Sequence, residues 1–160
     1  MAIREGDRLP ETTFEMMTAE GKKQLTTADV FAGRRVVLFA VPGAFTGTCS
    51  NVHLPGYLQE IEALKARGAD AIVCTAVNDA SVMRAWEKQT GAEGKIMFLA
   101  DGNADFARKL GLDIDLSRSG MGLRSRRYSM IVEDGVVRRL NVEEKPGVNV
   151  SGVETMLAQL

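Results

Sequence analysis

The sequence has few of the residues that stabilise exported or metal-rich proteins. It contains two cysteines and one histidine in 160 residues. Two cysteines cannot build a disulfide framework, so a reducing cytoplasm is the default expectation. No apolar run approaches the roughly 20 residues that a membrane-spanning helix needs. The charged start of the chain also has no apolar signal core. The sequence therefore predicts a cytoplasmic protein without a membrane partner.

The chain also has no marked excess of acidic or basic side chains. Twenty basic side chains oppose 21 acidic ones, and the formal net charge is −1, so no global attraction to nucleic acid is expected. A local basic cluster consists of Arg118, Arg124, Arg126 and Arg127. Because aromatic side chains are not interleaved with it, we expect no nucleic-acid partner. The length predicts a single domain over residues 1–160.

The chain has an alternation of apolar runs with amphipathic ones. Strands are predicted at 36–41, 70–77, 95–99, 128–133 and 136–140. Helices are predicted from Leu54 to Gly68, after Asn78 or Asp79, at 104–110, and after a capping box at Ser151–Glu154. The Asp134-Gly135 pair indicates a β-hairpin. This order predicts an α/β fold: a mixed sheet with helices on both faces, closed by a C-terminal hairpin and helix.

A loop at residues 42–48 leaves the end of the first predicted strand, where sites in α/β folds gather. If a helix begins near Thr46 or Thr48, Cys49 lies in its first turn. Unpaired N–H groups and the positive end of the helix dipole favour an anion there. A thiol in that position is shifted towards the thiolate, which is the nucleophilic form. Cys49 is thus a candidate nucleophile, and the alternative is a small buried side chain.

Three other kinds of site share features with this loop. A phosphate-binding P-loop is rejected, because Gly43 and Gly47 are one residue too close and no lysine follows. A metal site would need Cys49, His53 and Cys74, which are scattered over two elements, so no metal is expected. A Cys-His hydrolase would depend on His53, four residues after Cys49. That alternative stays open, although a packed or hydrogen-bonded role for His53 is favoured.

Pro42, Thr46 and Cys49 form a P-x-x-x-T-x-x-C pattern that resembles the signature of the peroxiredoxins. The continuation to Tyr57 and the segment 126–135 resemble the type II, or peroxiredoxin-five-like, subgroup. The likeness covers essentially the whole chain and implies a thioredoxin-like fold. It also implies a thiol-dependent peroxidase that reduces hydrogen peroxide and organic hydroperoxides without metal, flavin or other cofactor.

The resemblance implies roles for individual residues. Cys49 matches the peroxidatic cysteine, which becomes a sulfenic acid. Thr46 matches the threonine that orients the peroxide, and Pro42 the proline that shields the sulfur. Arg127 matches an arginine that would stabilise the thiolate and the departing oxygen, and its alternative is membership of the solvated basic cluster. The predicted substrate pocket adds Gly43, Phe45, Gly47, Thr48 and Met121, with Leu123 as a further apolar wall.

Two features distinguish this chain from common members of that family. Gly47 stands where relatives commonly have proline, which predicts a looser loop with preserved chemistry. Cys74 lies within an apolar strand and is expected to be inert. It is not in the C-terminal region, here 147–152, where some relatives carry a resolving cysteine. A one-cysteine mechanism is therefore predicted.

The resemblance suggests partners as well. Oxidised Cys49 would be reduced by an external thiol, either glutaredoxin with glutathione or thioredoxin. A homodimer joined near the active-site loops is expected. A function of another class stays open, namely a redox-sensing or chaperone-like module on the same fold.

Overall fold

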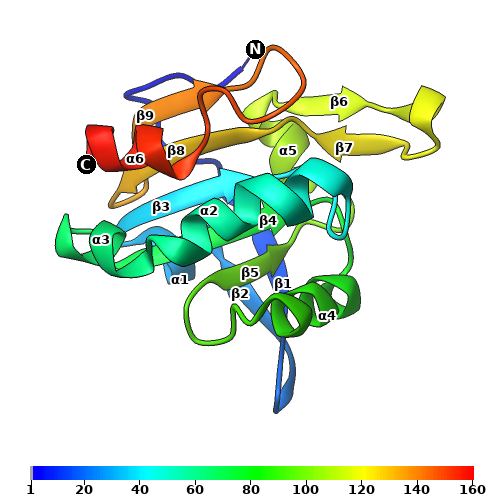
Figure 1. Ribbon diagram of the computed structural model, residues 1–160, viewed down its shortest axis with the longest axis horizontal. Coiled ribbons are helices and arrows are strands. Elements are labelled where there is room, and N and C mark those ends of the chain that lie inside the picture. Colours follow the sequence, from blue (N-terminus) through cyan, green and yellow to red (C-terminus); the bar gives the residue numbers. More distant parts are fainter. Residues whose placement is uncertain (1) are drawn as a thin grey trace.

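A seven-stranded mixed sheet organises the computed structural model, which describes residues 2–160 (Figure 1). Its strand order is β2-β1-β5-β4-β3-β8-β9. In chain order the strands are β1 Thr13–Thr18, β2 Gly21–Thr26, β3 Arg35–Ala40, β4 Ala71–Ala76, β5 Met97–Ala100, β8 Tyr128–Glu133 and β9 Val136–Val142. The central β3, β4 and β5 are parallel, and antiparallel strands flank them on both sides. The predicted mixed sheet is confirmed.

Helices cover both faces of this sheet, as predicted. They are α1 Thr27–Phe31, the π-helix η1 Cys49–His53, α2 Leu54–Gln59, α3 Ile61–Ala66, α4 Ala80–Thr90, α5 Asp105–Leu110, the 3₁₀ helix η2 Ser117–Ser119 and α6 Val153–Gln159. The helices α2, α3, α4 and α6 share one hydrophobic cluster, and α1 and α5 share the other. No helix in the described part of the chain is long and apolar enough to span a bilayer.

Strand β3 contributes to both clusters, which explains its unbroken apolar sequence. Val37 and Phe39 belong to the cluster under α2 and α4, whereas Val36 and Leu38 belong to the cluster under α1 and α5. Successive side chains of a strand point to opposite faces, so a strand buried on both sides has no polar face to alternate. The predicted hairpin also forms, and Asp134 and Gly135 have φ values of 48° and 78°. Positive φ at both positions is what a two-residue hairpin of this kind requires.

The sequence patterns missed two pairs of strands. The β1–β2 hairpin was not predicted because β2 is mostly exposed and presents polar side chains, Lys22, Lys23 and Gln24, without alternation. The second pair, β6 Asp113–Asp115 and β7 Leu123–Ser125, forms a short separate ribbon beside the main sheet (Figure 1). Strands of three residues are too short to show a period.

Two helix boundaries also differ from expectation. The helix predicted from Leu54 to Gly68 begins earlier, at residue 47, and a break at Glu60 separates α2 from α3. The predicted capping box at Ser151 is wrong. The N-cap of α6 is Gly152, and the Ser151 hydroxyl donates instead to the carboxylate of Glu143, 2.7 Å away. A charged acceptor makes the stronger hydrogen bond, so the serine serves the preceding loop rather than the helix.

Candidate active site

Cys49 lies in the first helical turn after the loop that leaves β3. The turn is closed by the Ser50 N–H, which donates to the Thr46 carbonyl at 2.9 Å. From Cys49 onward the turn widens into the π-helix η1, where the Leu54 N–H donates to the Cys49 carbonyl. Such insertions occur frequently at functional sites. The thiol has no exposed surface and packs in the cluster between β3 and α2.

Arg127 reaches Cys49 from the neighbouring strand. Because β8 pairs antiparallel with β3 in a register that sets Tyr128 opposite Ala40, the residue before Tyr128 lies beside the loop at 42–48. The Nη2 atom of Arg127 donates to Cys49 Sγ at 3.1 Å. This guanidinium is half-buried and always charged, so it can stabilise an ionised sulfur through a charge-assisted hydrogen bond.

His53 holds the other side of the same guanidinium. Arg127 Nη1 lies 2.9 Å from His53 Nδ1, and His53 Nε2 lies 3.0 Å from the carbonyl oxygen of Ser151. A guanidinium only donates and a carbonyl only accepts, so the two partners select the neutral tautomer with its proton on Nε2. Burial lowers the pKa of His53 from 6.5 to about 4, and the charge of Arg127 acts in the same direction. His53 is therefore an uncharged acceptor for Arg127.

This arrangement differs from that of a Cys-His hydrolase. Within residues 2–160, no hydrogen bond joins Cys49 to His53, although the two residues share a helical face. The interpretation of His53 as a hydrogen-bonded residue agrees with the structure, but its contact with Arg127 was not foreseen. The spacing of four residues from Cys49 was the available signal, because it directs both side chains to one side of the turn.

The remaining predicted residues lie in or beside the loop in three groups. Pro42 and Thr48 line a hollow together with Arg127. Gly43, Thr46 and Met121 lie around the guanidinium of Arg124, so close to one another that a Cβ atom at position 43 would meet Arg124 Nη1 at 2.9 Å and Thr46 Cγ2 at 3.0 Å. The exposed group consists of Phe45, Gly47 and Leu123.

Arg124 has a role that sequence reasoning missed. It was assigned to a solvated cluster, but the side chain is half-buried and bridges two backbone carbonyls. Its Nη1 donates to Pro42 O at 3.2 Å and its Nε to Met121 O at 2.9 Å. Arg124 thus ties the loop after β3 to the chain before β7. The Thr46 hydroxyl donates to Gly43 O at 2.8 Å, within the same loop.

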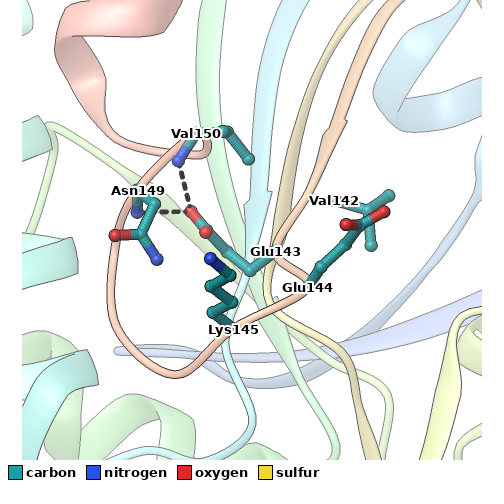
Figure 2. A pocket seen from close by; sticks show the side chains of 6 residues that line it. All are labelled: Val142, Glu143, Glu144, Lys145, Asn149 and Val150. Atoms are coloured by element: carbon teal, nitrogen blue, oxygen red, sulfur yellow. Dashed lines mark hydrogen bonds between the residues drawn. The ribbon is translucent and has the colours of Figure 1, made fainter.

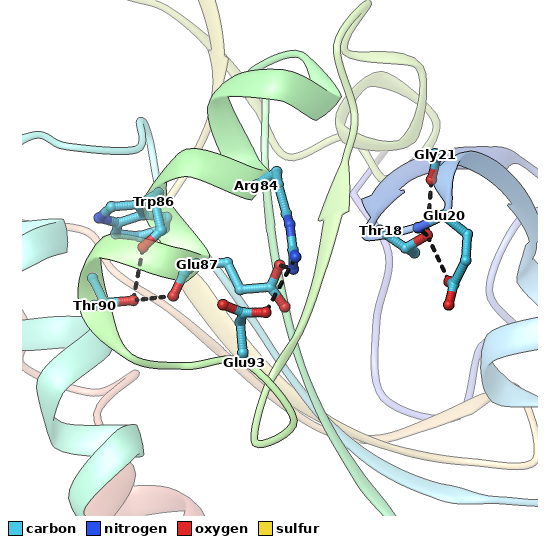
Figure 3. A network of polar contacts seen from close by, with 8 residues as sticks. All are labelled: Thr18, Glu20, Gly21, Arg84, Trp86, Glu87, Thr90 and Glu93. Atoms are coloured by element: carbon cyan, nitrogen blue, oxygen red, sulfur yellow. Dashed lines mark hydrogen bonds and ion pairs between the residues drawn. The ribbon is translucent and has the colours of Figure 1, made fainter.

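Helix α4 supports the turn of Cys49 from behind. Trp86 is fully buried and its Nε1 donates to Ser50 Oγ at 3.1 Å. The same helix is fastened by Thr90, whose hydroxyl donates to the Trp86 carbonyl at 2.8 Å, and by Arg84, which forms ion pairs with Glu87 and Glu93 (Figure 3). The residue next to the nucleophile is therefore anchored to a rigid element.

Cys74 is the second free thiol and lies in β4, paired in register with Phe39. It is completely buried, and burial raises the pKa of its thiol well above the ordinary value. A protonated thiol in an apolar layer is a poor nucleophile. This environment agrees with the expectation of an inert core residue.

Comparisons with known proteins place this site in a family. The Redoxin family model matches residues 4–157. Peroxiredoxin-2E-2, chloroplastic, from Oryza sativa subsp. japonica is 48% identical over 163 residues, which cover 99% of this chain and 72% of that protein. The name of this relative gives a chloroplast, so the cytoplasmic location stays a prediction.

Solved structures agree with the sequence relatives. Reduced Prx3 from Vibrio vulnificus, solved in complex with hydrogen peroxide, is 50% identical with a TM-score of 0.94 and coverage of 98% of both chains. Peroxiredoxin 5 from Alvinella pompejana is 35% identical with a TM-score of 0.86 and coverage of 99% of both chains. The chain therefore belongs to the peroxiredoxins, in the type II, peroxiredoxin-five-like subgroup with a thioredoxin-like fold, and is a thiol peroxidase.

Proposed function

We propose that Cys49 carries the peroxidase reaction by a one-cysteine mechanism. Its thiolate attacks one oxygen of the hydroperoxide, the O–O bond breaks, and the other oxygen leaves as water or an alcohol after taking a proton. Cys49 becomes a sulfenic acid. An external thiol then attacks the sulfur and releases water to form a mixed disulfide, and a second thiol restores the reduced enzyme. The observation that carries this proposal is the 3.1 Å contact between Arg127 Nη2 and Cys49 Sγ.

Arg127 has the geometry to act on both the ground state and the transition state. One of its nitrogens already faces the sulfur, and negative charge moves from that sulfur to the departing oxygen during the reaction. A fixed cation next to both atoms stabilises the charge without reorganising. His53 keeps the guanidinium in place through its second nitrogen.

Thr46 and Pro42 complete the proposed catalytic group. The Thr46 hydroxyl donates a hydrogen bond to Gly43 O, so its lone pairs remain free to accept a hydrogen bond from the peroxide. This would turn the attacked oxygen towards Cys49. Pro42 lies beside Thr48 and Arg127 in the adjacent hollow, where it would keep water from the sulfur. The peroxide complex of the Vibrio relative supports hydrogen peroxide as a substrate of this chain.

The burial of both thiols supports a reductant from outside the chain. Cys74 is enclosed in the sheet, and no third cysteine exists to resolve the sulfenic acid. Because Cys49 has no exposed surface, its helical turn must open before a thiol larger than peroxide can reach it. Glutaredoxin with glutathione, or thioredoxin, would serve. The exposed apolar side chains of Phe45 and Leu123 near the loop support a homodimer that joins there.

Turnover assays with single-cysteine variants test this proposal. Peroxide consumption should continue in Cys74→Ser with glutaredoxin and glutathione or with thioredoxin, and should stop in Cys49→Ser. A Cys74→Ser protein that reacts once with peroxide and then stalls would disprove the one-cysteine mechanism. If the wild-type protein itself stalls after one oxidation with every thiol system, the redox-sensing module is the better account.

A further inference from the structure

Glu143 lies where β9 gives way to the loop that leads into α6, and it is almost fully buried. Its Oε2 atom accepts the backbone N–H groups of Asn149 and Val150 at 2.8 Å (Figure 2). It also accepts the N–H and the hydroxyl of Ser151, both at 2.7 Å. Burial acts to raise the pKa of Glu143, but the hydrogen bonds from Ser151, Val150 and Asn149 outweigh it and hold the pKa below its usual value. The carboxylate therefore stays ionised and fixes the 149–151 turn.

The same turn presents a carbonyl to the helix that carries Cys49. Ser151 O accepts the Tyr57 hydroxyl at 2.7 Å and the Nε2 proton of His53 at 3.0 Å. Ser151 has no exposed surface, so water does not compete for this carbonyl. A continuous set of hydrogen bonds thus runs from Glu143 through Ser151 and His53 to Arg127.

We propose that Glu143 is a positioning residue for the peroxidase reaction, acting through the Ser151 carbonyl and the His53 ring to hold Arg127 beside Cys49. This inference rests on the role proposed above for Arg127. Glu143 does not touch the sulfur. It determines where the acceptor for His53 Nε2 lies, and that acceptor and the Arg127 donor together select which ring nitrogen carries the proton.

The tautomer of His53 links the position of the 149–151 turn to the position of Arg127. If the 149–151 turn shifts, Nε2 of His53 loses its acceptor, and Arg127 alone then disfavours the tautomer with a proton on Nδ1. That proton would face Arg127 Nη1, which is also a donor, so the guanidinium would have to move. Displacement of a catalytic group by about 1 Å is enough to slow a reaction on the order of a hundredfold.

Other groups around His53 do not supply the same control. The ring packs against Phe39, at 5.1 Å between centroids, and against Tyr57, at 5.6 Å. The charged groups that act on it are Arg127 and Glu143. The backbone N–H of Glu143 also donates to Arg127 O at 2.9 Å. A side-chain substitution leaves that bond intact, so it tests the carboxylate alone.

Glu143→Gln is the test, with Glu144→Gln as the matched control. Glu144 is the next residue, is exposed, and makes no hydrogen bond or ion pair in residues 2–160. His53 is the single histidine, so nitrogen-15 NMR of the imidazole reports its tautomer without assignment. We expect the Nε2-protonated tautomer in the wild type and in Glu144→Gln. In Glu143→Gln we expect a mixture of tautomers and a peroxide rate constant lower on the order of tenfold, with a further drop in Glu143→Ala.

Several results would overturn the inference. A wild-type protein whose His53 is protonated on Nδ1 contradicts it directly, whatever the variants do. A Glu143→Gln protein that melts at a lower temperature but keeps both the tautomer and the peroxide rate would show a structural role only. If Glu143→Ala does not fold, the Gln variant decides the matter. A wild-type protein that does not turn over peroxide would instead disprove the proposed function.

Discussion

Arg127 and Cys49 are 78 residues apart in the chain, yet the guanidinium Nη2 of one lies 3.1 Å from the sulfur of the other. Strand pairing brings them together. The strand β8 runs antiparallel to β3, and the start of β8 lies beside the loop that follows β3. The second terminal nitrogen of Arg127 is occupied by His53. A planar fork that serves two acceptors at once requires arginine, since a lysine ammonium presents its donors from a single atom.

Arg127→Lys is expected to lower the second-order rate constant for peroxide on the order of a hundredfold or more, as removal of a single donor to a developing anion does in other enzymes. The charge remains, but the bond to His53 or the bond to Cys49 is lost. Stopped-flow kinetics with hydrogen peroxide measures the change. Arg126→Lys is the control, because Arg126 is exposed and immediately adjacent. Equal rates for the two variants would contradict the role of Arg127.

Gly47→Ala and Gly47→Pro are expected to stabilise the protein by about 0.4–1 kcal/mol. Gly47 is the first helical residue, its φ is not positive, and no described atom lies within 4 Å of a Cβ built there. Proline is favoured at such a position because its fixed φ suits the helix. Urea unfolding measures the change, and peroxidase activity should be retained.

The matched control for Gly47 is Gly91→Ala. Gly91 also has open space around its Cβ position, but it ends α4 with φ of 74°. A side chain there is strained, so the same substitution should destabilise. Two changes of the same sign would refute the conformational argument.

The stability of the protein is expected to fall as the pH drops from about 6.5 to about 4. The pKa of His53 is about 4 in the folded protein, against 6.5 ordinarily. The unfolded chain therefore binds more protons in this window, and stability rises with pH across it. The difference amounts to about 3 kcal/mol once both states are protonated.

The pH effect is measured by urea unfolding across that window for wild type and His53→Gln. Subtraction of the two curves removes the contributions of carboxyl groups such as Glu143. The variant should show a shallower pH dependence. Parallel curves would mean that His53 titrates normally in the folded protein.

Trp86 fluorescence is expected to report the opening of the active-site turn. Trp86 is the single tryptophan, and its Nε1 bonds to Ser50, the neighbour of Cys49. If oxidation opens the turn, this bond breaks and the indole meets water, so emission should shift to longer wavelength after one equivalent of peroxide. Cys49→Ser should show no shift. An unchanged spectrum, with the sulfenic acid verified by mass spectrometry, would show that the turn stays closed.

The sequence was sufficient to predict the centre of the fold and to select Cys49 as the candidate nucleophile. The continuous apolar run of β3, rich in β-branched residues, favours a strand that is buried on both faces. The loop that follows it, with Cys49 at a helix start, could be read from local rules. The proximity of Arg127 came from family resemblance, because no local rule pairs residues so far apart.

The missed features depend on competition between partners. Ser151 fits a capping pattern, but Glu143 offers a charged acceptor that only the folded loop brings within reach. Arg124 looked solvated because its acceptors are backbone carbonyls of Pro42 and Met121, which carry no side-chain signal. The tautomer of His53 likewise depends on a carbonyl 98 residues away.

The separation of Cys49 from Arg127 along the chain has a consequence for synthesis. A ribosome adds Cys49 to the chain 78 residues before Arg127, so the growing polypeptide holds the sulfur before it holds the guanidinium. The contact between Arg127 and Cys49 forms when β8 docks against β3, so the proposed catalytic pair is assembled only in the folded protein.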